Sequence, residues 1–156
     1  MLKAQMPLRV QIVTAEREVF ADENVDMVVA PGAEGVVGIL PKHAPLLTTL
    51  LPGVVRIKHG TAEQAMTVGG GFLQVARDKV LILADTAERE DEIDEARAEE
   101  ARRRARGTLQ EAIVSGQHLQ AESARFALRR AEARIHLARR RRGTRGFTPP
   151  PGSSEP

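Results

Sequence analysis

Asp94 and Arg97 are the two side chains whose types and spacing are best suited to binding a ligand. They lie three residues apart in the hexapeptide IDEARA at residues 93–98, where residues that favour helices begin to dominate. A carboxylate accepts hydrogen bonds from amino and hydroxyl groups, and the planar, permanently charged guanidinium matches phosphate oxygens. The same spacing also suits an ion pair on a solvated helix, which contributes only about 0.2–0.5 kcal/mol. The pair is therefore a candidate site for a phosphorylated ligand, with a surface ion pair as the alternative.

No group of residues in the sequence has the spacing of a catalytic site. The four histidines are spread along the chain without the spacing of metal ligands. Gly69–Gly71 is not followed by the Lys-Ser/Thr of a phosphate-binding loop, so close packing of strands explains these glycines better. The absence of cysteine excludes disulfides and thiolate chemistry. We therefore expect a protein that is not an enzyme by itself and has no metal site.

Charge is unevenly distributed, although the formal net charge is only +2. Residues 88–100 are mainly acidic, and arginine dominates from Ala101 onward. Basic helices bind nucleic-acid phosphates non-specifically, but the basic segment has no interleaved aromatic residues and no recognisable reader motif. Nucleic-acid binding and simple solubility are two interpretations of this pattern. The arginines concerned are Arg125, Arg129, Arg130, Arg134, Arg139, Arg140, Arg141 and Arg142.

The first half of the chain has the pattern of a β-domain. Leu8, Val10 and Ile12 alternate with polar residues, which is typical of a half-buried strand. Short apolar runs continue to Leu83, separated by Gly/Pro turns at spacings of about ten residues. The pattern predicts an antiparallel β-sandwich over residues 1–85. Because Trp and Tyr are absent, its core must consist of aliphatic side chains.

Two helices are predicted after the β-domain, from about residue 91 and from about residues 117 to 141. Their expected apolar stripes are Ile93, Arg97, Ala101, Ala105, Leu109 and Ile113, and then Ala124, Ala127, Leu128, Ala131, Ile135 and Ala138. Joined at Ser115-Gly116, they predict an αα-hairpin over residues 86–142. Alanine-rich seams bury little area, at about 25 cal/mol per Å², so we expect a hairpin that detaches easily. The fold class is α+β, a sandwich followed by a hairpin, and residues 143–156 are expected to form a disordered Pro/Gly/Ser tail.

The segment Gly32–Leu51 combines glycines, prolines and apolar residues, which predicts a stiff, extended stretch between turns. His43 is expected to make a structural hydrogen bond between two prolines. The pattern Gly35-x-x-Gly38-Ile-Leu-Pro41-x-His43-Ala-Pro45-Leu-Leu resembles the signature of the epsilon subunit of rotary, proton-driven ATP synthases. The resemblance continues from about Leu8 to Arg140 and implies a β-sandwich with a mobile helical C-terminal domain.

The resemblance also implies three sets of site residues. A regulatory ATP molecule would be bound by Glu88, Ile93, Asp94, Arg97, Ala98, Arg104, Arg130 and Arg134. Contact with the gamma subunit or the membrane rotor ring would involve Glu34, Gly35, Val36, Gly38, Leu40, Pro41 and His43. An inhibitory basic face would consist of Arg125, Arg129, Arg130, Arg134, Arg139 and Arg140.

By resemblance, the chain is a non-catalytic central-stalk subunit that couples proton translocation to ATP synthesis. Its helices would inhibit ATP hydrolysis by placing arginines against acidic segments of the alpha and beta subunits. No cofactor would be required, and ATP would be a regulatory ligand. No apolar run approaches the roughly 20 residues of a membrane span, so we expect no membrane insertion. The resemblance implies a peripheral position on the cytoplasmic face of the bacterial cell membrane. A nucleic-acid-binding or scaffold protein with a basic helical arm is the alternative.

Overall fold

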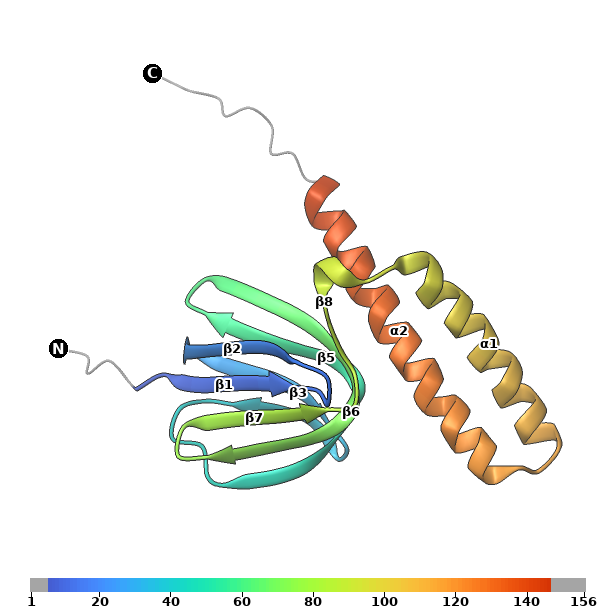
Figure 1. Ribbon diagram of the computed structural model, residues 1–156, viewed down its shortest axis with the longest axis horizontal. Coiled ribbons are helices and arrows are strands. Elements are labelled where there is room, and N and C mark those ends of the chain that lie inside the picture. Colours follow the sequence, from blue (N-terminus) through green and yellow to red (C-terminus); the bar gives the residue numbers. More distant parts are fainter. Residues whose placement is uncertain (1–5, 147–156) are drawn as a thin grey trace, which may run out of the picture.

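The computed structural model describes residues 6–146 as a β-domain with a helical hairpin beside it (Figure 1). The elements in chain order are β1 (Leu8–Val13), β2 (Glu18–Val25), β3 (Met27–Gly32), β4 (Gly35–Ile39), β5 (Leu46–His59), β6 (Ala62–Ala76), β7 (Lys79–Ala84), β8 (Ala87–Arg89), the 3-10 helix η1 (Glu90–Glu92), α1 (Glu95–Val114) and α2 (His118–Gly146). The predicted fold class, a sandwich followed by an αα-hairpin, is confirmed.

The strands run in the order β2-β1-β7-β6-β5-β3-β4, and β8 pairs with β6. The long strands β5 and β6 have 14 and 15 residues and stay in register from Leu46↔Val75 to His59↔Ala62. Every pairing is antiparallel except that of β1 with β7, where Val10 lies opposite Val80. Local patterns did not predict this parallel pair, because it joins segments that are far apart in the sequence.

The core of the sandwich is aliphatic, as its composition requires. Leu8, Val10 and Ile12 on β1 are buried, which confirms the alternation predicted for this strand. They pack with Val, Ile and Leu side chains from the facing strands, and Phe20 is the aromatic member of this cluster. A continuous apolar core of this kind gives the sandwich its own source of stability.

The glycine run in β6 lies where this strand passes from β7 to β8. Gly70 and Gly71 have φ of +103° and +131°, which L side chains rarely adopt. A Cβ at Gly71 would lie 2.1 Å from the carbonyl oxygen of Leu83, and one at Gly69 would lie 2.0 Å from Oγ1 of Thr86. Close strand packing, and not a phosphate-binding loop, therefore explains these glycines.

Three predicted boundaries differ from the structure. β8 adds residues 87–89 to the sheet, so the sheet continues past residue 85, where the sandwich was expected to end. The first helix begins at Glu95 and not near residue 91, because residues 90–92 form η1 and Ile93 is extended and buried. The second helix continues to Gly146, past its expected end near residue 141. The rest of the predicted tail, residues 147–156, lies outside the described residues.

The apolar stripe predicted for the first helix is only partly correct, since Ile93 and Ala105 are buried and Ala101 and Leu109 are half-buried. α1 buries Ala98, Ala105 and Ala112, which are seven residues apart, whereas Arg97 and Ile113 are exposed. The stripe predicted for α2 is largely correct, since Ala124, Ala131, Ile135 and Ala138 are buried. α2 also buries Leu137, because this helix lies between α1 and the sheet (Figure 1).

Candidate functional site

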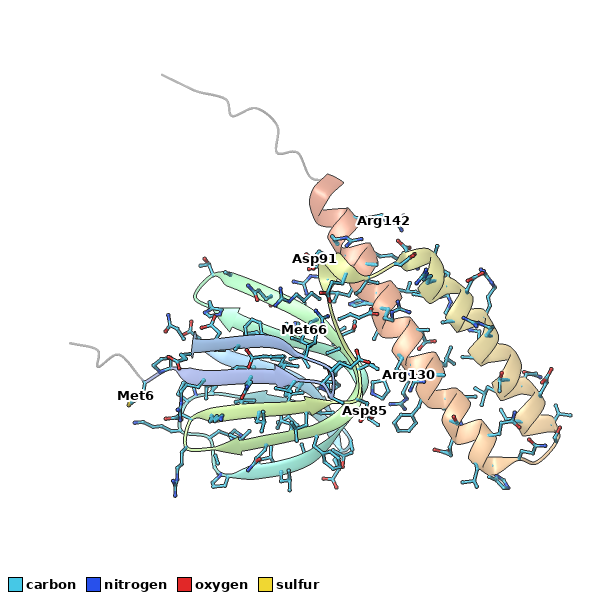
Figure 2. All side chains as sticks on the ribbon, in the orientation of Figure 1. Met6, Met66, Asp85, Asp91, Arg130 and Arg142 are labelled. Carbon is cyan, nitrogen blue, oxygen red and sulfur yellow. The ribbon has the colours of Figure 1, made fainter. Side chains whose placement is uncertain are left out.

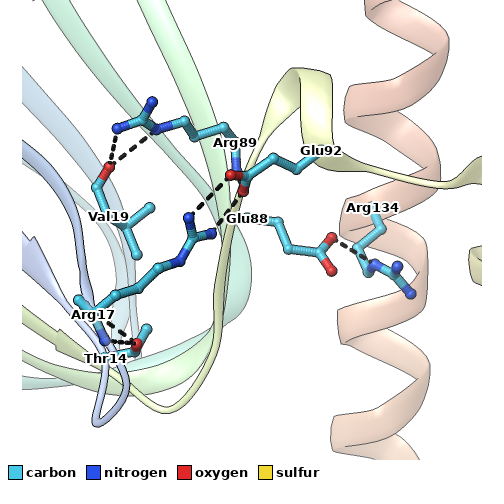
Figure 3. A network of polar contacts seen from close by, with 7 residues as sticks. All are labelled: Thr14, Arg17, Val19, Glu88, Arg89, Glu92 and Arg134. Atoms are coloured by element: carbon cyan, nitrogen blue, oxygen red, sulfur yellow. Dashed lines mark hydrogen bonds and ion pairs between the residues drawn. The ribbon is translucent and has the colours of Figure 1, made fainter.

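Three residues of the predicted ATP set, Glu88, Arg130 and Arg134, line one cavity between the sheet and the hairpin. Its volume is about 280 Å³, and hydroxyl groups of Thr67 and Thr86 complete its polar lining. Arg134 Nε lies 2.9 Å from Glu88 Oε2 (Figure 3). Arg130 projects from α2 toward the sheet (Figure 2). The cavity therefore presents two guanidinium groups and one carboxylate to a ligand.

The other members of the predicted ATP set do not line this cavity. The carboxylate of Asp94 caps α1 by accepting a hydrogen bond from the backbone N–H of Arg97 at 3.2 Å. The Arg97 side chain is 81% exposed, with Nε 3.6 Å from Asp94 Oδ2, which is the geometry of the alternative ion-pair interpretation. Ile93 and Ala98 are buried, and Arg104 is exposed on α1. Ala101, Ala127 and Ala131 also line the cavity and form its apolar walls. They were predicted as apolar residues of the helices, but not as part of the binding site.

Most arginines of the predicted basic face contact acids of the same chain. Arg134 binds Glu88, Arg139 binds Glu95 and Glu99, Arg140 binds Glu63, Arg142 binds Glu95, and Arg125 binds Glu122. Three acids of the run at residues 88–100, Glu88, Glu95 and Glu99, therefore pair with arginines that follow the run.

A polar network holds β8 and η1 on the sandwich (Figure 3). The guanidinium of Arg89 donates to the carbonyl oxygen of Val19 on β2 at 3.0 and 2.6 Å. Glu92 accepts from Arg17 in the turn between β1 and β2, and from the backbone N–H of Arg89. The hydrogen bond from Arg17, and then the one from Arg89, lower the pKa of the Glu92 carboxyl, and Glu92 in turn raises the pKa of Arg17.

The predicted contact segment Glu34–His43 lies at the turn between β3 and β4, along the edge strand β4 and just beyond it. Glu34, Gly35, Val36, Gly38 and Leu40 are exposed, and Pro41 and His43 are half-buried. His43 Nδ1 lies 2.7 Å from the carbonyl oxygen of Ala44, which confirms its structural hydrogen bond. An exposed, polar-flanked segment of this kind is available for contact with another protein.

An exposed apolar surface that the sequence did not identify lies on the outer side of the sandwich. Leu47, Phe72 and Leu83 are 72%, 54% and 49% exposed. Phe72 lies opposite Thr49 on β5 and Leu83 on β7, so these side chains share one face of adjacent strands. We call Leu47, Phe72 and Leu83 the outer apolar patch. The sequence does contain a sign of this patch: an apolar residue directly beside a core residue of a strand, as Phe72 is beside Leu73, points to the opposite, outer face.

Two further properties concern the described part of the chain. Within residues 6–146, no set of three or more acidic or histidine side chains is placed to hold a metal ion. Neither α1 nor α2 carries the apolar length that crossing a bilayer requires.

Comparisons with known proteins agree with this architecture. Residues 7–90 match the ATP synthase delta/epsilon chain beta-sandwich domain, and residues 91–139 match the delta/epsilon chain long alpha-helix domain. The chain is 50% identical to the ATP synthase epsilon chain of Dehalococcoides mccartyi over 135 residues, 86% of this chain and 94% of that one. It is 48% identical to the ATP synthase epsilon chain of Herpetosiphon aurantiacus over 137 residues, 88% of this chain and 98% of that one.

Among solved structures, the fold is similar to a chain in the cryo-EM structure of the Euglena gracilis mitochondrial ATP synthase (OSCP/F1/c-ring in rotational state 1). The TM-score is 0.69 at 22% identity, over 82% of this chain and 79% of that chain. At this identity the structural likeness supports the fold alone. Membership of a family is supported instead by the two domain matches and the relatives of about 50% identity, which are matches of sequence. The chain therefore belongs to the ATP synthase epsilon chain family.

Proposed function

We propose that this chain is a non-catalytic subunit of the central stalk of a bacterial proton-driven ATP synthase, at the cytoplasmic face of the cell membrane. It would couple proton translocation to ATP synthesis as part of the rotor. The observation that carries the proposal is a rigid sandwich with an exposed apolar patch, within a chain that matches the family from residue 7 to residue 139.

The outer apolar patch is the surface we assign to the gamma subunit. Exposed, clustered apolar side chains on a stable sheet are suited to a lasting protein contact. The Glu34–His43 segment is the surface we assign to the membrane rotor ring, because it combines exposed apolar and acidic side chains. Co-purification of this chain with a gamma subunit tests the first assignment, and its loss on replacing Leu47 with Asp would support the patch as the contact.

The hairpin would inhibit ATP hydrolysis by placing its arginines against acidic segments of the alpha and beta subunits. In the observed arrangement those arginines contact acids of this chain, so inhibition requires the hairpin to leave the sandwich first. Because Arg17 and Arg89 hold β8 and η1 on the sandwich, the suitable truncation removes residues 93–156 and leaves that network intact. An unchanged ATPase rate of the complex after this truncation would refute inhibition by the hairpin.

ATP is the ligand we assign to the cavity of Arg130, Arg134 and Glu88. Guanidinium groups suit phosphate oxygens. The volume of about 280 Å³ is at the lower end for ligand pockets, so the cavity would hold only part of the nucleotide. ATP bridging α2 and β8 would stabilise the docked hairpin and so relieve inhibition by mass action.

A further inference from the structure

The last turns of α2 carry two sets of arginines that contact different parts of the chain. The sandwich-facing arginines are Arg134, Arg140 and Arg141, and the α1-facing arginines are Arg139 and Arg142. Both sets lie within nine residues of one helix. This end of α2 therefore holds the hairpin to the sandwich and also holds the two helices to each other.

The sandwich-facing arginines reach three different elements of the β-domain and its extension. Arg134 binds Glu88 on β8 at 2.9 Å, and Arg140 binds Glu63 on β6 at 2.8 Å. Arg141 donates to the backbone carbonyl oxygen of Glu90 in η1 at 2.8 Å.

The α1-facing arginines form an alternating network with the first turns of α1. Arg139 binds Glu99 at 2.7 Å and Glu95 at 3.3 Å, and Arg142 binds Glu95 at 2.9 Å. Glu99 also binds Arg102 of its own helix at 2.6 Å. These contacts close the open end of the hairpin, opposite the turn at residues 115–117.

The apolar contact beneath these ion pairs is small. Ala65, Ile93, Leu137 and Ala138 form it, with Val54 packed against them, and Leu137 is its one leucine. An open cavity of about 750 Å³ beside it is lined by Glu63, Arg140 and Arg141, among others, so water and salt ions can reach the contacts of Arg140 and Arg141. Charge interactions that salt can screen therefore contribute to docking of the hairpin.

The connectivity sets the order in which the two sets can be released. α1 is tethered at Asp94 to Ile93, which is buried against the sandwich, and at its other end to α2 through a three-residue turn. While α2 stays docked, both ends of α1 are fixed, so α1 cannot separate far from α2. The hairpin can open only after α2 has left the sandwich.

We propose that the two arginine sets are successive latches: the sandwich-facing arginines control undocking, and the α1-facing arginines keep the undocked hairpin closed. Undocking at increasing salt would release a closed hairpin before an extended one. The bearing of this order on inhibition rests on the proposed function, whereas the order itself is a property of the isolated chain.

The test measures two distances by electron paramagnetic resonance of spin-labelled, full-length chain. Because the chain has no cysteine, exposed positions can be labelled as unique pairs. Glu23→Cys with His136→Cys reports the sandwich-to-α2 distance, and Ala96→Cys with His136→Cys reports the α1-to-α2 distance. None of the three positions is buried, and none belongs to either arginine set.

Three double variants carry the same change in charge. R134E/R140E disrupts the sandwich-facing set, R139E/R142E disrupts the α1-facing set, and R125E/R129E is the matched control on the same helix, away from both sets. The pairs disrupted in the first two variants are only partly exposed. Two surface ion pairs correspond to roughly a 2- to 30-fold change in the released fraction. We expect R134E/R140E to lengthen only the sandwich-to-α2 distance, and the control to change neither distance.

We expect R139E/R142E to lengthen the α1-to-α2 distance only when it is combined with R134E/R140E. A longer α1-to-α2 distance in R139E/R142E alone would overturn the order. So would an increase of both distances in R134E/R140E. Unchanged distances in every variant would overturn the latches. A salt titration of the labelled chain without Arg substitutions provides the same test if a variant fails to fold, and simultaneous lengthening of both distances there would again refute the order.

Discussion

The carboxylate of Glu92 accepts two hydrogen bonds from the guanidinium of Arg17, at 3.1 and 2.8 Å, across 75 residues of sequence. Glu92 also accepts from the backbone N–H of Arg89 at 3.0 Å. This relationship attaches η1 to the turn between β1 and β2 (Figure 3). β8 and η1 are thus part of the β-domain, and any movement of the helices begins after Glu92.

Glu92→Gln tests this attachment through its pH dependence. Because the folded-state pKa of Glu92 lies below its ordinary value of 4.5, its contribution to stability is present above that value and is lost as the pH falls through the folded-state pKa. We expect acid to reduce the unfolding free energy of the native chain more than that of the variant. Urea unfolding at pH 7 and at about pH 3 measures the difference. Glu100→Gln, at an exposed position of α1, is the control, and an equal acid effect in all three chains would contradict the attachment.

Leu47→Asp tests the outer apolar patch as the gamma-binding surface. The side chain is 72% exposed, so the isolated chain should keep its stability within about 0.5 kcal/mol. A charge within an apolar contact should weaken gamma binding about tenfold or more. Titration with purified gamma subunit measures the affinity. Leu119→Asp makes the same change at a leucine that is 89% exposed on the hairpin, and equal losses in the two variants would argue against the patch.

Gly71→Ala should be among the most destabilising single substitutions in the sandwich. The residue has φ of +131°, and the new Cβ would meet the carbonyl oxygen of Leu83 at 2.1 Å. We expect a loss of at least about 3 kcal/mol in the unfolding free energy. Gly107→Ala, on α1, would place its Cβ in open space and should instead stabilise by about 0.8–1 kcal/mol. Urea unfolding of both variants checks the contrast, and a neutral Gly71→Ala would show that the strand can shift.

Asp94→Ala should destabilise α1, because this carboxylate caps the helix. The expected loss is about 1 kcal/mol, whereas Asp94→Asn should lose little, since asparagine caps nearly as well. Amide hydrogen exchange in the first turn of α1 measures the effect. Equal protection in the alanine variant and the native chain would contradict the cap.

Asp94→Asn is also the better variant for ATP titration, because any loss of affinity there reports a contact with the ligand.

Arg130→Ala should weaken ATP binding by the isolated chain about tenfold to 150-fold, because a charge-assisted hydrogen bond to phosphate contributes about 1.5–3 kcal/mol. Arg129→Ala removes the same charge from the neighbouring position, outside the cavity, and should change affinity much less. Isothermal titration calorimetry with ATP measures both. Equal affinities for the two variants would exclude the cavity of Arg130 and Arg134 as the nucleotide site.

Local patterns predicted the local part of this structure. The alternation of Leu8, Val10 and Ile12 identified a strand and its buried face, because one face of that strand contacts the core. α1 was predicted as a helix, but its buried face was assigned only in part, since Ala105 is buried whereas Arg97 and Ile113 are exposed. Its alanines offer several equivalent stripes, and contacts with α2 select Ala98 and Ala105.

Contacts between distant segments could not be predicted from the sequence alone. The swing from acidic to basic residues suggested partners outside the chain, yet Glu88 and Glu63 bind Arg134 and Arg140, which are 46 and 77 residues away. A charge pattern identifies which residues attract each other. It does not identify whether the opposite charge lies in the same molecule.

β5 and β6 run through the whole sandwich as one continuous ladder, from Leu46↔Val75 to His59↔Ala62. Because both layers of the sandwich contain parts of β5 and β6, one layer cannot slide over the other without breaking the pairing of these strands. In the proposed rotor role, this continuity would let the domain turn as one unit. The same continuity implies that the β-domain unfolds in a single cooperative step.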